Sequence, residues 1–159
     1  MWDYHVLLLE GLPAADVQAG AAPALVWDLD SSLPCPCPLP AYAARALLPP
    51  AALGLPPRRY RVVPAPALLR HFSSDRRHMR LAGGGWASPP PGHACIVSET
   101  GSTHTLPQYL ETGGQPEAAA AGLRRRLAAA SAGEAGAAED FGVVATEAAL
   151  LECFGATGS

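Results

Sequence analysis

The sequence has little charge, few aromatic side chains and no long apolar run. Of its 159 residues, 16% are charged and 6% are aromatic, and the formal net charge is -3. The arginines are scattered, so the chain lacks the basic face on which nucleic-acid binding depends. No apolar run approaches the roughly 20 residues that span a bilayer. We therefore expect a soluble intracellular protein with no nucleic-acid partner and no membrane partner.

Cysteines are also few: Cys35, Cys37, Cys95 and Cys153. They are too sparse for a disulfide scaffold and are typical of small, mostly buried thiols in a reducing compartment. The stretch "PCPCP" has a Cys-x-Cys spacing, but no second pair completes a metal site. A zinc site made of His5, Asp28 and Cys37 lacks paired-ligand spacing as well. We therefore predict no metal and no cofactor.

Hydrophobic patterning predicts a mixed α/β fold. Stretches rich in Val and Leu predict strands, the first of them buried on both faces. The first two strands are close enough in sequence to be neighbours in one sheet. The prolines of residues 33–40 predict an irregular loop. The predicted strands are 4–10, 24–30, 58–64, 93–98 and 141–145, and the predicted helices are 41–48, 65–72, 105–111 and 147–154, the last capped by Thr146.

The length of the chain predicts one domain over residues 1–159. Within it, residues 113–139 form a tract of Gly, Ala, Glu and Arg that predicts a mobile low-complexity insertion. Part of this tract, residues 116–130, has the propensity to form a helix.

His5 and the acidic end of the second predicted strand could do chemistry together. If the two strands pair, a histidine on one and an aspartate on the other can face the same side. A carboxylate that orients an imidazole is the proton-transfer half of a nucleophile–His–Asp site. Asp28 and Asp30 are two residues apart and share a face on a regular strand, so spacing does not choose between them. A purely structural hydrogen bond remains an alternative.

Several ordered blocks carry a family resemblance: "WDYHVLLL", "VWDLDSSLPCPCP", "RRYRVVPAPALLRHFSSDRRHM", a tryptophan ahead of "PPPGHACI", and "FGVVATEAALLECFG". Together they resemble the protein N-terminal glutamine amidohydrolases. The resemblance covers nearly the whole chain apart from residues 113–139 and the loop after Leu9, which looks longer than usual.

The resemblance implies an α/β (α+β) fold with a core like those of papain-like and transglutaminase-like cysteine hydrolases. It implies hydrolysis of the side-chain amide of an N-terminal glutamine to glutamate, with release of ammonia. Arginylation of that glutamate feeds proteins into the N-degron route to degradation. The expected partners are proteins and peptides that begin with Gln. We expect a monomer in the cytoplasm, with the nucleus as a second compartment.

Residue roles follow from the same resemblance. His5 matches the catalytic histidine and Asp28 the carboxylate that orients it, which leaves Asp30 as a secondary, structural residue. Ser74, Asp75 and Trp86 are expected to frame the substrate pocket, with Asp75 as a partner for the substrate's α-ammonium group. A capped turn for the first two and a loop anchor for the tryptophan are the alternatives.

The family's nucleophilic cysteine lies upstream of the Trp-Asp-Tyr-His motif. We therefore expect an N-terminally truncated chain that lacks its nucleophile and is inactive alone. Cys37 and Cys95 match positions that are not catalytic in the family, whereas Cys35 matches none and lies nearest to Asp28 in sequence. A relative that binds protein N-termini without hydrolysis is the alternative function.

Overall fold

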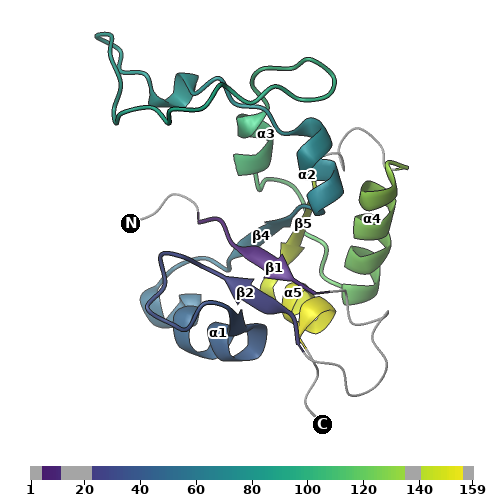
Figure 1. The fold of residues 1–159 in the computed structure, drawn as a ribbon. Helices are drawn as coiled ribbons and strands as arrows, with labels where there is room; N and C mark the ends of the chain where they lie inside the picture. Colours follow the sequence, from purple (N-terminus) through teal and green to yellow (C-terminus); the bar gives the residue numbers. More distant parts are fainter. Residues whose placement is uncertain (1–4, 12–22, 135–140, 156–159) are drawn as a thin grey trace. The chain divides into compact units, whose positions relative to one another are not determined.

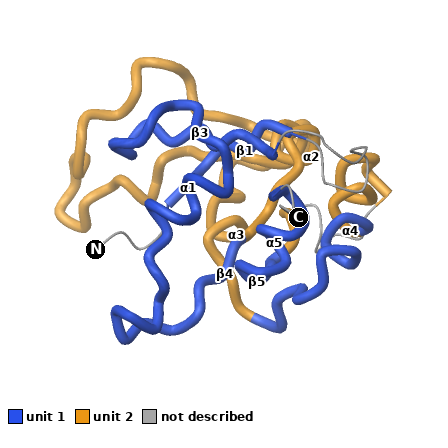
Figure 2. Tube along the Cα trace, turned by 90° about the horizontal axis from the view of Figure 1, so that it is seen from below, with its two compact units in different colours: residues 1–60, 114–125, 144–159 blue, residues 61–113, 126–143 orange. Residues whose placement is uncertain are grey.

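The computed structural model of the chain describes residues 5–11, 23–134 and 141–155. Figure 2 shows its division into two compact units. Unit 1 consists of residues 1–60, 114–125 and 144–159, and unit 2 of residues 61–113 and 126–143. Helices and short strands both occur, which confirms the mixed α/β prediction. In the part of the chain that the structure describes, every helix is too short or too polar to cross a membrane.

Unit 1 contains a three-stranded antiparallel sheet in the order β1-β2-β3. Strand β1 (Leu8–Glu10) pairs with β2 (Leu25–Trp27), and Leu9 lies opposite Val26. Strand β3 (Cys37–Pro38) pairs with the other side of β2. Strands β1 and β2 run side by side in Figure 1, which confirms that the first two predicted strands are neighbours.

Two expectations for this sheet are wrong. The first strand is not buried on both faces, because Val6 is 76% and Leu8 59% exposed. Among the described residues β1 pairs only with β2, so it lies at the sheet's edge. The proline-rich segment 33–40 is not wholly irregular either, since it contains β3. Pro38 is tolerated there because an edge strand does not need every N–H in the ladder.

Helices α1 (Leu39–Ala46) and α5 (Glu147–Phe154) complete unit 1, together with the short 3-10 helix η2 (Pro50–Leu53). Helix α1 packs against β2, β3 and α5. It begins two residues before the predicted start, because proline fits the first turn of a helix. The predicted cap of α5 is confirmed: Thr146 Oγ1 accepts a hydrogen bond from the Ala149 N–H at 3.2 Å.

Strands β4 (Arg59–Val62) and β5 (Val143–Thr146) lie in segments that were predicted to be strands, and the two pair to form a second sheet. The division between the units falls within both strands and within helix α4 (Ala120–Ala132). This helix belongs to the tract that was expected to be mobile, yet Leu123, Leu127 and Ala130 are buried. Leucines four residues apart share one helix face, and alanines allow close packing around them. Residues 135–139 of the tract lie outside the described residues.

Unit 2 contains α2 (Ala65–His71), the 3-10 helix η3 (Arg77–Met79) and α3 (Leu106–Leu110), where two of the predicted helices are confirmed. The rings of Phe72, Tyr109 and Phe141 meet edge to face, with 5.4 Å between the centroids of each contacting pair. The strand predicted over 93–98 is wrong. In the described structure that segment makes a single isolated bridge, between Ile96 and Ser74, and its Ile96 and Val97 are exposed.

Gly142 precedes β5 and lies at a closely packed point of unit 2. It has a φ of +87°, and a Cβ added there would lie 2.5 Å from the Val62 carbonyl oxygen and 2.7 Å from Val63 Cγ2. Gly84 in the same unit also has a φ of +87°, but a Cβ there would meet nothing within 4 Å. The two glycines therefore separate backbone strain from steric overlap.

We expect Gly142→Ala to lower the free energy of unfolding by about 3 kcal/mol or more, because overpacking adds to the strain of a positive φ. Gly84→Ala carries the strain alone and should cost about 1–2 kcal/mol. Urea unfolding followed by circular dichroism measures both. Equal losses in the two variants would contradict the close approach at Gly142.

Candidate active site

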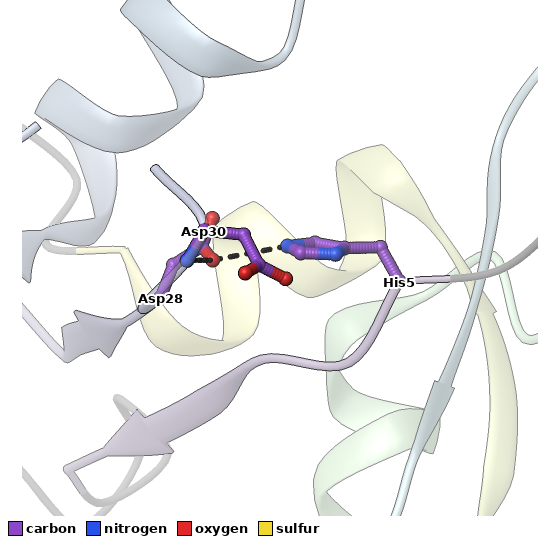
Figure 3. A group of neighbouring side chains, drawn as sticks. All are labelled: His5, Asp28 and Asp30. Carbon is purple, nitrogen blue, oxygen red and sulfur yellow. Dashed lines mark hydrogen bonds and ion pairs between the residues drawn. The ribbon is translucent and has the colours of Figure 1, made fainter. Parts of the chain in front are cut away.

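The structure brings His5 and Asp28 together in unit 1. His5 precedes β1 and Asp28 follows β2, so the pairing of these strands carries both residues to one end of the sheet (Figure 3). The His5 Nε2 atom lies 3.1 Å from Asp28 Oδ1. At this end the described ladder stops at the pair of Leu8 and Trp27, and Asp30 lies in the turn that follows β2.

Asp28 is the most strongly held member of this group. Its carboxylate is buried, and Oδ2 accepts a hydrogen bond from the Tyr42 hydroxyl at 2.7 Å. The backbone N–H of Asp30 donates to Oδ1 at 3.0 Å. With the His5 contact, the carboxylate has partners from the start of β1, from its own turn and from α1. Asp28 is thereby fixed in a single orientation toward the imidazole.

These contacts shift the pKa of the Asp28 carboxyl group and the pKa of the Tyr42 phenol. Burial raises the pKa of Asp28, but the hydrogen bonds from Tyr42, from the Asp30 N–H and from His5 outweigh it, so the pKa lies below its ordinary value. Burial and the hydrogen bond to Asp28 raise the pKa of the Tyr42 phenol. At neutral pH Asp28 is therefore an anion and Tyr42 a hydrogen-bond donor.

Asp30 lies beside this pair but differs from Asp28 in its surroundings. It is exposed, and Figure 3 shows its carboxylate next to the His5 ring. One ligand atom from each of His5, Asp28 and Asp30 lies within 4.8 Å of the others, so the three could in principle hold a metal ion. However, both Asp28 oxygens already accept hydrogen bonds, and His5 Nε2 faces Asp28 rather than an open ligand position. The group does not include Cys37.

The thiols of the sequence differ in accessibility. Cys37 and Cys153 are buried, as expected, whereas Cys35 and Cys95 are exposed. Burial raises the pKa of the Cys153 thiol, which disfavours the reactive thiolate. The Cys37 Sγ contacts the Pro38 carbonyl oxygen at 3.7 Å.

Ser74, Asp75 and Trp86 belong to unit 2, whereas His5 and Asp28 belong to unit 1. Ser74 Oγ accepts a hydrogen bond from the Arg76 N–H. The Asp75 carboxylate accepts hydrogen bonds from the Arg77 N–H and guanidinium, which lower its pKa to about 2. The Arg80 guanidinium lies 3.8 Å from the centroid of the Trp86 ring. These contacts fit a capped turn and a loop anchor, and a role in substrate binding stays a prediction.

Sequence reasoning missed Tyr42. It occurs in "AYAARALL", where nothing in the sequence distinguishes it from an ordinary buried residue of an amphipathic helix. Its chemistry could have revealed it, because a tyrosine on the buried face of a helix needs a hydrogen-bond partner for its hydroxyl. The acidic end of the preceding strand could have supplied one.

A histidine held by a buried carboxylate is an arrangement that enzymes with a nucleophile use for proton transfer, and it also occurs as a purely structural hydrogen bond. A comparison with known families shows which family this chain belongs to. The family model of the N-terminal glutamine amidases matches residues 1–154, and the chain belongs to that family. The resemblance drawn from the sequence blocks is thereby confirmed.

Relatives agree with this assignment. The chain is 36% identical to the protein N-terminal glutamine amidohydrolase of Arabidopsis thaliana over 135 residues, which cover 80% of this chain and 59% of that protein. It is 41% identical to the one from Oryza sativa subsp. indica over 111 residues, 69% of this chain and 46% of that protein. The chain thus spans about half the length of the curated relatives it matches.

The hydrogen bond between Tyr42 and Asp28 can be tested by Tyr42→Phe. We expect the pKa of Asp28 to rise and the free energy of unfolding at pH 7 to fall by about 1.5–3 kcal/mol, the range for hydrogen bonds to charged groups. Because the folded-state pKa is depressed, this stabilisation is complete above the ordinary value of about 3.9 and is lost as the pH falls through the folded-state value. The difference between the two proteins should therefore shrink in acid.

Carbon NMR of the Asp28 carboxyl group during a pH titration measures the pKa, and urea unfolding measures stability. Tyr60→Phe is a matched control, because the Tyr60 hydroxyl donates to Glu147 Oε2 at 2.8 Å in the same unit. It should leave the titration of Asp28 unchanged. An identical Asp28 titration in wild type and Tyr42→Phe would contradict the proposed role of the phenol.

Proposed function

We propose that this chain supplies the histidine and carboxylate of an enzyme that hydrolyses the side-chain amide of an N-terminal glutamine. The observation that carries the proposal is the 3.1 Å contact between His5 Nε2 and a buried Asp28 oxygen, held from its other side by Tyr42. The names of the relatives, which state the same activity, support it.

In the proposed reaction a cysteine thiolate attacks the carboxamide carbon of the substrate. Asp28 holds the His5 Nε2–H, so that Nδ1 takes the proton from the thiol and passes it to the departing ammonia. The carbon–nitrogen bond breaks and a thioester forms. Water, deprotonated by the same ring nitrogen, then attacks the thioester to give glutamate and return the thiol. The Asp28 anion stabilises the imidazolium that forms in each half of the cycle.

The source of the thiol follows from the family resemblance, which puts the nucleophilic cysteine ahead of the Trp-Asp-Tyr-His motif. The complete reaction thus needs a thiol delivered to His5 from that position, on a core like those of papain-like and transglutaminase-like hydrolases. We further propose that the enzyme is a monomer, that it acts in the cytoplasm and nucleus, and that its product feeds the N-degron route.

Ammonia release from a short peptide that begins with Gln tests the proposal. The assay compares the 159-residue chain with a chimera in which the Cys-bearing segment that the family resemblance puts ahead of the Trp-Asp-Tyr-His motif is joined ahead of Met1. We expect the chimera to release ammonia and His5→Ala or Asp28→Asn to lower kcat by about 10²–10⁴, the usual contribution of general acid–base catalysis. His78→Ala, which removes an exposed histidine of η3, is the control and should keep full activity.

Other results identify other functions. Release by the 159-residue chain alone, abolished by Cys35→Ser, would show that the exposed Cys35 is the nucleophile. Binding of the peptide without release in either protein would favour the non-catalytic alternative. Release that survives His5→Ala would contradict the proposed mechanism.

A further inference from the structure

Asp30 provides an exposed negative charge at the edge of the candidate active site. Its carboxylate belongs to the group whose ligand atoms lie within 4.8 Å of one another, with His5 and Asp28. Asp30 lies in the turn that follows β2, and Figure 3 shows its carboxylate beside the His5 ring. A substrate group bound at the imidazole can therefore lie close to this carboxylate.

Among the described residues, the Asp30 carboxylate has fewer partners than the Asp28 carboxylate. Asp28 accepts hydrogen bonds from a phenol and a backbone N–H and contacts an imidazole. Within residues 5–11, 23–134 and 141–155, by contrast, the structure shows no hydrogen bond or ion pair that engages the Asp30 carboxylate. An exposed anion beside a reaction centre favours a substrate that carries a positive charge near its reacting bond.

An N-terminal glutamine has that charge at a suitable distance. Its α-ammonium nitrogen is four bonds from the carboxamide carbon, so the two atoms are at most about 5 Å apart. A carboxylate that binds the ammonium must then lie close to the group that exchanges protons at the carboxamide, as Asp30 does. An internal glutamine has a neutral amide nitrogen in the same place and gains nothing from the contact.

We propose that Asp30 binds the α-ammonium group of the substrate and so restricts the enzyme to glutamine at a chain terminus. The inference rests on the proposed function and gives the reason why that reaction would be specific for a glutamine at a chain terminus. It gives Asp30 a part in substrate recognition beyond the structural one expected from the sequence. The backbone N–H of Asp30 also donates a hydrogen bond to Asp28. The residue that binds the substrate therefore also orients the carboxylate that holds His5.

Asp75 is the other residue predicted for this role, and its surroundings make it less suitable. The Arg77 Nε lies 2.9 Å from one of its carboxylate oxygens, and the same guanidinium contacts that oxygen through a second nitrogen. An ammonium group would have to displace an arginine that already binds the carboxylate through two donors. Asp30 offers an anion without such a competitor among the described residues.

The proposal is tested by equilibrium binding of two peptides to the 159-residue chain, measured by calorimetry. One peptide begins with Gln and has a free α-ammonium, and the other has the same sequence with an acetylated N-terminus. We expect the wild-type chain to bind the free peptide at least about tenfold more tightly, the effect of one charge-assisted hydrogen bond. Asp30→Asn, which keeps the shape and the backbone N–H, should bind the two peptides within about threefold of each other.

Two further variants make the result specific. Glu10→Gln removes an exposed carboxylate from the far end of β1 and should keep the full preference for the free peptide. Asp75→Asn tests the rival assignment. Loss of the preference in Asp75→Asn but not in Asp30→Asn would overturn the proposal, as would a wild-type chain that binds neither peptide or both equally. The ammonia assay tests the proposed function separately. If the chain prefers the free peptide but no ammonia is released in that assay, this inference stands and the proposed function is rejected.

Discussion

The carboxylate of Asp28 must be satisfied before unit 1 can bury it, because an unpaired buried charge costs several kcal/mol. Tyr42 from α1, the N–H of Asp30 and the ring of His5 together meet that need. Each partner comes from a different segment, so the helix, the turn after β2 and the residues ahead of β1 are tied to one acid. The contacts that keep Asp28 ionised also hold its carboxylate against the imidazole of His5.

Local signals in the sequence were enough for much of the fold. Thr146 marks the start of α5 through its own hydroxyl, whereas α1 begins at Leu39, two residues before its predicted start. Burial was harder to predict, because it depends on what packs against an element. The leucines of β1 are indistinguishable in sequence from a central strand, yet Leu8 is exposed at the sheet's edge. Conversely, the alanine-rich α4 looks featureless in sequence but buries Leu123 and Leu127.

The site was predictable to a similar extent. His5 and Asp28 follow from a family motif, and alternation along the predicted strand 24–30 put the two aspartates on one side. The alternation does not say which is buried, since that is decided by α1 and its Tyr42, whose position depends on tertiary packing. The structure therefore separates two aspartates that the sequence presents as equivalent. One is enclosed and holds the histidine, and the other faces solvent, where it can meet a ligand.

The site also depends on how β1 is aligned. Among the described residues three pairs join β1 to β2, and His5 lies three positions before the first of them. Inserting a single residue between His5 and Leu8 would move the imidazole away from Asp28 while every existing pair could remain. The length of that short connection therefore determines whether the two side chains meet. Natural variation should preserve this length even where it replaces the apolar residues within it.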